Sequence, residues 1–335
     1  MKAVLCKAYG PPDSLVIEEV ESPAPGPGEV VISVKAAGVN FPDVLIIENK
    51  YQLKPPLPFS PGSEVSGVVK AVGAGVTNPR PGDRVMAILG FGGFAEEVKS
   101  DSRRVLEIPE GMDFPTAAGF GLTYATSEHA LCDRGALKAG ETLLVLGAAG
   151  GVGIAAIEIG KALGARVIAC ASTDDKLAVC RAHGADETIN YATEDLRERI
   201  KQLTAGKGID VVYDPVGGSY TELALRSLAW RGRLLVVGFA AGEIPKIPLN
   251  LTLLKGCSIV GVFWGDFARR EPERFANAMR QLGRWFAEGR LKPHISETFP
   301  LERASAALTM MANRQVKGKV VIITRSGGAA TPSGR

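Results

Sequence analysis

The 335-residue sequence is poor in the residues that build disulfides and metal sites. It holds five cysteines, an odd and scattered set without a C-x-x-C pair, and only three histidines. Such a pattern does not match a disulfide framework and is typical of reduced, small apolar residues, so we expect a cytoplasmic protein. The histidines, at positions 129, 183 and 294, do not have the spacing of metal ligands.

Long apolar runs and an excess of one charge are also missing. No apolar stretch approaches the ~20 residues of a membrane span. The net charge is only +3, and no basic stripe with interleaved aromatics predicts a nucleic-acid groove. A chain of this length is too long for one ordinary core, so we expect a globular protein of two domains.

Glycine, in contrast, is abundant, with 40 residues, and it is most informative around residues 143–154. An apolar run, Thr142 to Leu146, is followed by small residues and then by a helical apolar pattern from Val152 to Leu163. This order predicts a buried parallel strand that turns sharply into a helix. The turn reads A-x-G-x-x-G, with Ala148 at the first glycine position of the dinucleotide fingerprint.

The turn has the features of a pyrophosphate site. Gly150 would let the backbone approach the phosphates, and Gly153 would let the helix pack closely on the strand. The helix N-terminus would add free N–H groups and a partial positive charge. We therefore predict that the turn binds a dinucleotide through Ala149, Gly150, Gly151, Val152 and Gly153.

The second strand, Ala165 to Ser172, distinguishes between the two dinucleotides. An NAD site usually places Asp or Glu there, about 20 residues on, to accept a hydrogen bond from the ribose 2′-OH. Small and hydroxyl residues stand there instead, Lys176 follows, and Tyr191 ends the next strand. A hydroxyl does not repel a 2′-phosphate, so we predict NADPH with contacts from Ser172, Lys176 and Tyr191. An ordinary cap and a solvated face are the structural alternatives for Ser172 and Lys176.

The pattern of elements predicts an α/β protein in three parts. Residues 1–120 are rich in strands that proline and glycine interrupt. Residues 121–290 alternate strands and helices, which predicts a doubly wound parallel sheet of six strands in the order 3-2-1-4-5-6. Residues 291–325 are expected to return to the first domain, with the ligand in the cleft between domains. Residues 326–335 are rich in Gly, Ala and Ser, and we expect them to be disordered.

Several motifs carry a resemblance to a known family: Ala37-Gly-Val-Asn-Phe-Pro-Asp43, Pro61-Gly-Ser-Glu-Val-Ser-Gly67, Pro81-Gly-Asp-Arg-Val85, Gly121-Leu-Thr-Tyr124 and Val212-Tyr-Asp-Pro-Val-Gly-Gly218. In their order and spacing the chain resembles the medium-chain dehydrogenase/reductase superfamily, and most closely its zinc-free NADPH:quinone oxidoreductase (ζ-crystallin-like) branch. The resemblance implies a GroES-like catalytic domain and a Rossmann NADPH-binding domain. It also implies a homodimer, built by pairing of the edge strand expected at Ser258–Trp264.

The sequence departs from the zinc-dependent members of this superfamily. They have a cysteine ligand at the position of Asn40 and a Gly-His-Glu at Gly62-Ser63-Glu64. Asn and Ser are poor zinc ligands, and no cysteines of a structural-zinc lobe lie between Ala87 and Glu97, so we predict no metal site. Without a Lewis acid to polarise an alcohol, hydride delivery to an electrophilic quinone or α,β-unsaturated carbonyl is favoured.

The resemblance also suggests three catalytic residues. Tyr51 matches the tyrosine that zinc-free quinone reductases place in the cleft, where a neutral phenol can donate a hydrogen bond or a proton. Asn40 and Asp43 match polar residues of the same pocket. Asn40 would contact the nicotinamide ribose or the acceptor, and Asp43 is either catalytic or structural. For Tyr51 the structural alternative is a packing aromatic on a loop.

Further cofactor contacts are expected beyond the fingerprint. Thr123 resembles the threonine that orients the nicotinamide end, and Arg314 matches an arginine that reaches the 2′-phosphate, a role that suits its fork-shaped head group. A helix hydroxyl and a solvated arginine are the structural alternatives for these two. Lys319 is expected to be solvated. The ends of later strands should border the nicotinamide through Gly238, Phe239 and Phe263.

Three functions are compatible with these residues. The preferred one is an NADPH-dependent quinone reductase that works by hydride or one-electron transfer. The second is an NADPH-dependent reductase of activated C=C bonds, in enones or enoyl-CoA thioesters, for which Arg269-Arg270 is the compact basic pair. The third is a non-catalytic NADPH-binding protein with a structural or RNA-interacting role. Because Tyr51 and Asn40 are both present, we favour an enzyme.

Overall fold

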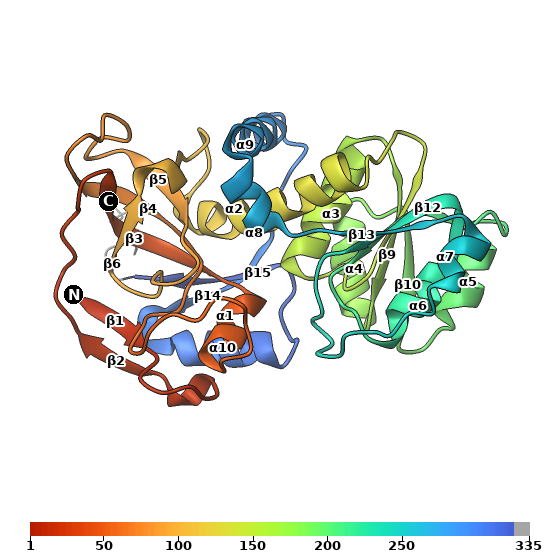
Figure 1. The fold of residues 1–335 in the computed structure, drawn as a ribbon, viewed down its shortest axis with the longest axis horizontal. Helices are drawn as coiled ribbons and strands as arrows, with labels where there is room; N and C mark the ends of the chain where they lie inside the picture. Colours follow the sequence, from red (N-terminus) through yellow and green to blue (C-terminus); the bar gives the residue numbers. More distant parts are fainter. Residues whose placement is uncertain (325–335) are drawn as a thin grey trace, which may run out of the picture. The chain divides into compact units, whose positions relative to one another are not determined.

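The computed structural model describes residues 1–324, so the tail predicted at 326–335 lies outside the described residues. The chain forms two compact units. The first contains Met1–Leu122 and the chain from Ile295 onward, and the second contains Thr123–His294. Each unit has its own sheet and its own core (Figure 1), and the predicted α/β class is confirmed. Within residues 1–324, no helix has the length and apolar character that a membrane span requires.

A seven-stranded sheet forms the centre of the first unit, in the order β14-β15-β3-β4-β5-β7 with β6 paired to β3. Its strands are β3 (Glu29–Val39), β4 (Glu64–Val72), β5 (Arg84–Ile88), β6 (Glu97–Asp101), β7 (Val105–Glu107), β14 (Ile295–Pro300) and β15 (Lys319–Ile323). A separate two-stranded sheet joins β1 (Lys2–Leu5) and β2 (Val16–Glu19). The helices of this unit are α1 (Phe41–Ile47) and α10 (Ala304–Ala312).

The returning strand β15 lies inside this sheet. It is antiparallel to β3, with Val320 opposite Val39, and parallel to β14 on its other side. Apolar residues of both β3 and β15 are fully buried, and the core that they share includes side chains from α1 and α10, such as Ile47 and Leu308. Segments from the two ends of the described chain therefore build one core.

The second unit is a doubly wound parallel sheet in the order β10-β9-β8-β11-β12-β13, which is the predicted 3-2-1-4-5-6. Its strands are β8 (Thr142–Val145), β9 (Arg166–Ala171), β10 (Glu187–Asn190), β11 (Ile209–Asp214), β12 (Leu228–Val236) and β13 (Ser258–Gly261). Residues 143–145 of the central strand are completely buried, as expected where helices cover both faces of a parallel sheet.

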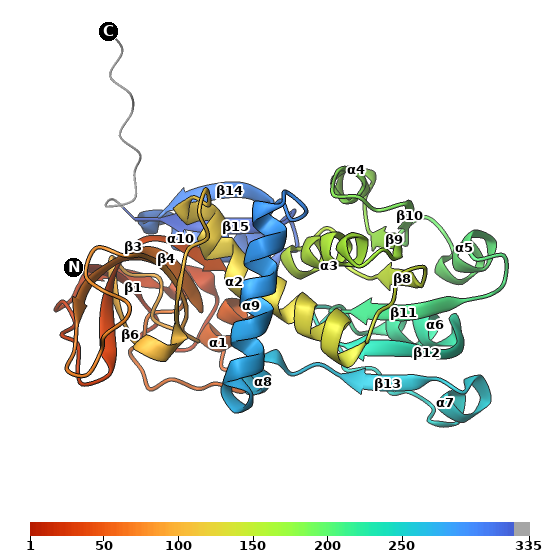
Figure 2. The same cartoon turned by 90° about the horizontal axis from the view of Figure 1, so that it is seen from above.

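Seven helices follow or connect these strands (Figure 2). They are α3 (Gly151–Ala162), α4 (Asp174–Ala182), α5 (Leu196–Leu203), α6 (Ser219–Arg226), α7 (Asn250–Lys255), α8 (Trp264–Arg270) and α9 (Pro272–Ala287). One more helix, α2 (Phe114–Glu128), begins in the first unit and ends in the second, where it continues into a π-helical turn, His129–Arg134.

The predicted edge strand Ser258–Trp264 is too long. β13 ends at Gly261, because its partner β12 ends at Val236, which is paired with Gly261. Trp264 instead begins α8 and is buried, with its ring 5.8 Å from that of Phe275 on α9. The tryptophan therefore belongs to the helical packing and not to the sheet.

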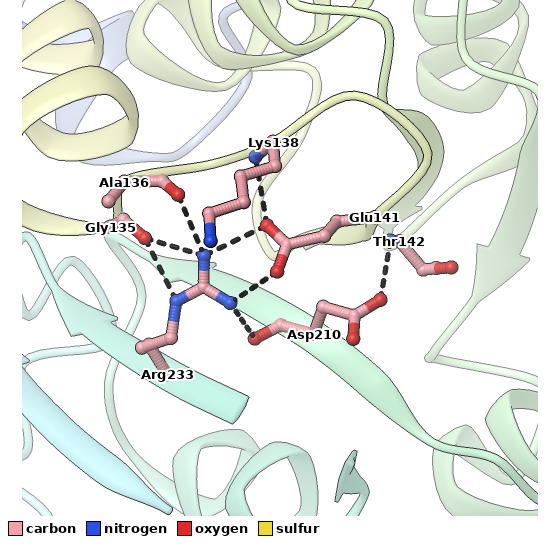
Figure 3. Close-up of polar contacts among 7 residues, drawn as sticks. All are labelled: Gly135, Ala136, Lys138, Glu141, Thr142, Asp210 and Arg233. Carbon is pink, nitrogen blue, oxygen red and sulfur yellow. Dashed lines mark hydrogen bonds and ion pairs between the residues drawn. The ribbon is translucent and has the colours of Figure 1, made fainter. Parts of the chain in front are cut away.

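Arg233 forms a cluster of hydrogen bonds near the amino ends of β8 and β11 (Figure 3). The guanidinium of Arg233 on β12 donates to both carboxylate oxygens of Glu141, at 2.8 and 2.9 Å. It also donates to the carbonyl oxygens of Gly135, at 2.6 and 2.9 Å, and of Ala136, at 3.1 Å. The hydrogen bonds from Arg233 are the main reason that the pKa of Glu141 is lowered. Polar groups at this end of the sheet are thus bound to each other, while the opposite end carries the fingerprint turn.

Candidate functional site

The fingerprint turn follows β8 directly and begins α3, as predicted. A Cβ atom at Gly153 would lie 2.5 Å from the carbonyl oxygen of Ala148, so only glycine fits the close packing of helix and strand. At Gly150, in contrast, the nearest atom would be 3.5 Å away, and the backbone φ is an ordinary −78°. The fold itself does not require glycine at 150, and without a side chain there the backbone can approach a phosphate group.

The N-terminus of α3 is free to bind an anion. No side chain caps it, and Gly150 occupies the N-cap position with an extended backbone. The first N–H groups of a helix have no partner within the helix, and the helix dipole makes this end partly positive. The turn residues Ala149, Gly151 and Val152 contribute backbone groups to the same place. The residues present therefore fit a dinucleotide pyrophosphate.

The structure brings the predicted 2′-phosphate residues of this unit to neighbouring strand ends. Ser172 follows the last residue of β9, and Tyr191 follows β10, with the backbone N–H of Tyr191 bonded to Ala171 at 3.1 Å. Lys176 lies in α4, which begins two residues after Ser172. The ring of Tyr191 packs against that of Tyr220, with 4.5 Å between their centres.

Two acidic residues at the start of α4 are engaged by neighbouring side chains. Asp174 accepts a hydrogen bond from the amide of Asn190 at 2.9 Å. Asp175 accepts one from the hydroxyl of Thr173. The end of β9 itself carries no carboxylate in the position where an NAD site usually has one.

The predicted nicotinamide contacts of the second unit lie after β12 and β13. The N–H of Gly238 approaches the carbonyl oxygen of Asp214 at 3.3 Å, and Phe239 is partly exposed. Phe263 precedes α8 and is 61% exposed. Thr123 is buried within α2, so its hydroxyl lies on a helix and does not immediately precede the fingerprint strand. These four residues remain predicted contacts.

Asp214, at the carboxyl end of β11, was not predicted as a site residue. One of its carboxylate oxygens accepts from the backbone N–H groups of Val216 and Gly217, both at 2.9 Å. The other oxygen accepts from the hydroxyl of Thr221 at 2.6 Å. Asp214 is buried and shapes the loop that follows β11. The motif around residues 212–218 was the available signal, but it does not reveal that the aspartate organises its own turn.

A second buried carboxylate, Glu158 on α3, was also missed. It accepts hydrogen bonds from the hydroxyl of Tyr124 at 2.7 Å and from the backbone N–H of Lys292 at 2.9 Å, and its other oxygen lies 2.6 Å from Nδ1 of His183. Burial, followed by the charge of Glu158, raises the pKa of Tyr124. Because the partners are far apart in the sequence, no local sequence pattern predicts this network.

In the first unit, Asn40 belongs to a buried polar cluster. Its amide nitrogen donates to Oε1 of Glu64 at 2.9 Å and to the hydroxyl of Ser63 at 3.2 Å. Its amide oxygen accepts from the ammonium of Lys319 at 2.7 Å. Both N–H groups of the Asn40 side chain thus have partners inside the protein. Its predicted contact with the ribose or the acceptor stays a prediction and would use the remaining lone pair of the amide oxygen.

The expectation that Lys319 is solvated is wrong. Lys319 is 4% exposed, and its ammonium donates to Oε1 of Glu64 at 2.7 Å, to the carbonyl oxygen of Val39 at 3.0 Å and to Asn40. An ammonium has three donors, and all three are used here. The lysine begins β15, next to β3, so the sheet pairing carries it into the interior where Glu64 compensates its charge.

Asp43 and Tyr51 lie on α1 and shortly after it. The carboxylate of Asp43 accepts from the backbone N–H of Asn40 at 2.8 Å, which fixes the start of the helix. Burial raises the pKa of Asp43 to about 7, although the hydrogen bond from Asn40 and the charge of Lys319 act in the opposite direction. Burial also raises the pKa of Tyr51, and the charge of Asp43 adds to this effect. The phenol therefore keeps its proton at neutral pH.

Arg314 lies in the turn after α10, in the first unit. Its backbone has a positive φ of 56°, and its N–H bonds to the carbonyl oxygen of Met311 at 3.0 Å. The left-handed conformation directs the chain from α10 toward β15. The arginine remains a predicted contact of the 2′-phosphate.

A GroES-like unit combined with this Rossmann sheet defines a medium-chain dehydrogenase/reductase. Residues 26–110 match the family described as "Alcohol dehydrogenase GroES-like domain", and residues 151–284 match "Zinc-binding dehydrogenase". The quinone oxidoreductase-like protein 2 homolog of Nematostella vectensis is 39% identical over 97% of this chain and 89% of its own length. The quinone oxidoreductase of Pseudomonas aeruginosa is 35% identical over 96% of this chain and 99% of its own length.

Solved structures agree with these sequence matches. The crystal structure of Escherichia coli quinone oxidoreductase complexed with NADPH superimposes with a TM-score of 0.90, at 30% identity, and covers 96% of this chain and 100% of that one. The chain belongs to the quinone oxidoreductase family of the medium-chain dehydrogenase/reductase superfamily.

One family description names zinc, but the residues of this chain do not fit that metal. Asn40 and Ser63 are not zinc-type ligands, and the ammonium of Lys319 already lies 2.7 Å from the carboxylate of Glu64. Within residues 1–324, no three His, Cys, Asp or Glu side chains come together as a metal site would need. No step of the proposed reaction is routed through a metal.

Proposed function

We propose that the protein is an NADPH-dependent oxidoreductase that reduces quinones without a metal. The observation that carries this proposal is the fingerprint turn, where α3 begins at an N-terminus that no side chain caps and that has a glycine, Gly150, at the N-cap position. Membership of the quinone oxidoreductase family supports the choice of substrate, and the NADPH complex of the Escherichia coli relative supports the choice of cofactor.

The residues of the second unit would hold the cofactor. Backbone N–H groups at the start of α3 would bind the pyrophosphate, and Ser172 and Lys176 would provide a hydroxyl and a positive charge for the 2′-phosphate. Bound NADPH supplies the hydride or the electrons. The nearby strand end carries no carboxylate that would repel the 2′-phosphate.

Tyr51 would act on the acceptor. Its phenol remains neutral at physiological pH because burial raises its pKa, so it can donate a hydrogen bond or a proton to the acceptor oxygen. Asp43 fixes the start of α1 through the backbone N–H of Asn40 and thereby positions the segment that precedes Tyr51. Hydrogen-bond donation to a developing oxyanion stabilises the transition state.

The first test is the oxidation of NADPH with a naphthoquinone and, separately, with a short-chain enoyl-CoA. We expect turnover of the quinone, and we expect Tyr51→Phe to lower kcat by roughly 100-fold through loss of the acid. Tyr9→Phe, which changes an exposed tyrosine of the same unit, is the matched control and should keep the wild-type rate. Turnover of the thioester alone would establish the alternative function, and an unchanged Tyr51→Phe rate would remove the assigned acid.

Two glycine variants test the cofactor site. Gly150→Ala should fold with wild-type stability, because the new methyl group meets no atom closer than 3.5 Å, but should weaken NADPH binding by about tenfold or more. Gly153→Ala should mainly lower the thermal stability, since its methyl group would press on the carbonyl oxygen of Ala148. Calorimetric titration with NADPH and thermal unfolding separate the two effects. Normal NADPH binding by Gly150→Ala would contradict the assigned phosphate position.

The structure gives no support to the predicted CoA contact. Arg269 and Arg270 share the single carboxylate of Asp266, with nitrogen–oxygen distances of 2.5 Å, so one of their two charges is compensated. The reductase of activated C=C bonds remains the second candidate because it would use the same Tyr51.

We also propose a cytoplasmic homodimer. One edge of β13 has no strand partner among the described residues, and exposed apolar side chains lie on β12, α7 and β13 and before α7: Trp230, Leu249, Leu253, Leu254 and Ile259. A second copy that extends the sheet would cover both features. All five cysteines are free thiols, which suits a reducing compartment. Sedimentation analysis should give twice the chain mass, and Ile259→Glu should give the monomer.

A further inference from the structure

A pocket of about 430 Å³ lies within the second unit, apart from any residue assigned above. Residues from the end of α2, the π-helical turn after it, α8 and α9 line it. This volume is within the range of small-molecule sites in proteins. The chemistry of the pocket follows from the side chains of α9, which is the long helix that crosses the view in Figure 2.

One face of α9 presents a row of hydrogen-bond donors to the pocket. Asn277, Arg280, Gln281 and Arg284 have the spacing of residues on one helix face. The guanidinium of Arg280 donates to the amide oxygen of Asn277, and that of Arg284 donates to the amide oxygen of Gln281 at 2.5 Å. Each amide oxygen orients a guanidinium without neutralising its charge. The amide N–H groups of Asn277 and Gln281 remain additional donors.

The carboxylates that line the pocket form no ion pair with Arg280 or Arg284. Asp133 is paired with Arg274 at 2.5 Å, and Arg274 also binds Glu271 at 2.5 Å. Burial raises the pKa of Glu128, although a hydrogen bond from the thiol of Cys132 lowers it in part. Neither Arg280 nor Arg284 forms an ion pair with a carboxylate in the described part of the chain.

Phe267 supplies an apolar wall beside these charges. Its ring stacks on that of His129, with 3.9 Å between the ring centres and 13° between the planes. The guanidinium of Arg274 lies 5.7 Å from the centre of the same phenylalanine ring. A pocket with an aromatic wall, two uncompensated guanidinium groups and spare amide donors suits an anion with several oxygens.

We propose that this pocket is a binding site for a phosphate-bearing ligand, with Arg280 and Arg284 as the groups that bind the phosphate oxygens. Planar guanidinium groups match phosphate bidentately. The phosphate could belong to a free inorganic anion or to a phosphorylated nucleotide such as coenzyme A, and the two sources share this chemistry. The site is separate from the fingerprint turn and does not depend on the proposed reductase activity.

The test is calorimetric titration of the full chain with pyrophosphate and, separately, with coenzyme A, at low ionic strength. The titration is made without NADPH, because NADPH also carries phosphates and would compete for the proposed pocket. The fingerprint turn is the same in wild type and in the double variant, so the difference between them reports on the pocket. We expect saturable binding that Arg280→Gln/Arg284→Gln weakens by at least about tenfold. Arg290→Gln is the matched control, because Arg290 lies beyond the end of the same helix and outside the pocket.

The three outcomes are distinct. Binding that the double variant loses and the Arg290→Gln protein keeps supports the site, and the tighter of the two probes identifies the source of the phosphate. Equal binding by wild type and the double variant would overturn it. Absence of binding by either probe at millimolar concentration would also overturn it. All three arginines are exposed, so thermal unfolding should show that the variants fold normally. Repeating the titration with Gly150→Ala, which changes only the fingerprint turn, separates this result from a failure of the cofactor assignment.

Discussion

Lys319 in the first unit and Arg233 in the second are strand cations that bond to segments far away in the sequence. Lys319 in the first unit is 4% exposed and bonds to Glu64, Asn40 and Val39. Arg233 in the second unit, at 18% side-chain exposure, bonds to Glu141 and to nearby carbonyl oxygens. The two clusters have comparable distances but different depths.

The depth of each cluster determines what removal of its cation should cost. A charge left alone in the interior keeps its full desolvation penalty, whereas water can reach a partly exposed carboxylate and replace part of the lost interaction. Glu64 is 2% exposed, while the side chain of Glu141 is 22% exposed. The comparison therefore predicts a larger loss of stability in the first unit.

The largest effect is expected for Lys319→Met, which leaves the Glu64 carboxylate unpaired in the interior. We expect the free energy of unfolding to fall by about 3–5 kcal/mol. Lys70→Met is the control, because Lys70 pairs with Glu97 at a similar 2.6 Å but is exposed, and its loss should cost at most about 1 kcal/mol. Denaturant unfolding measures both. Equal losses in the two variants would show that depth does not govern the strength of these pairs.

The next largest effect is expected from Asp43, which makes the free energy of unfolding depend on pH. Its pKa is raised from 3.8 to about 7 in the folded protein, so the folded state holds this proton more tightly than the unfolded chain does. The resulting stability is complete below pH 4 and is lost as the pH rises through 7. Between pH 5 and pH 8, wild type should lose about 2–3 kcal/mol that Asp43→Asn does not lose. Denaturant unfolding of both proteins across this pH range tests the prediction. If their free energies of unfolding change with pH in the same way, the raised pKa of Asp43 is refuted.

A smaller loss is expected for Arg233→Met. The carbonyl oxygens of Gly135 and Ala136 and the Glu141 carboxylate would lose their donor, at a cost of about 2 kcal/mol. Because Arg233 lowers the pKa of Glu141, its contribution should be present at neutral pH and diminish as the pH falls through the range where Glu141 becomes protonated. Denaturant unfolding at neutral and acidic pH tests both points. A loss larger than that of Lys319→Met would reverse the comparison.

Local patterns were sufficient for the fold of the second unit, whereas for the first unit they predicted only strands and the GroES-like fold followed from the family resemblance. The apolar run before the fingerprint glycines predicted β8 and α3, and the alternation of strands and helices predicted the strand order of the second unit. The predicted length of the edge strand was wrong, because a strand extends only as far as the strand with which it pairs. The edge strand expected to reach Trp264 ends at Gly261, because the neighbouring strand ends with it.

The site was less predictable because its contacts are long-range. Lys319 is separated from Glu64 by 255 positions, and a lysine in a polar segment is usually solvated, so only the sheet pairing reveals its burial. Glu158 was missed for the same reason, since its donors are 25 to 134 positions away. Asp214 was missed although its donors are local, because the motif does not show which of its side chains organises the turn. The Gly150 position, in contrast, was predictable, because the spacing of the fingerprint reflects local backbone geometry.

The position of β15 inside the first sheet has a consequence for the synthesis of the protein. A ribosome makes β3 early, but its neighbour β15 emerges only after the whole second unit. The second unit is contiguous and can therefore pack during translation, while one edge of β3 still lacks its partner. The nascent chain carries this open edge for most of its synthesis, and the strand made last completes the unit that began first.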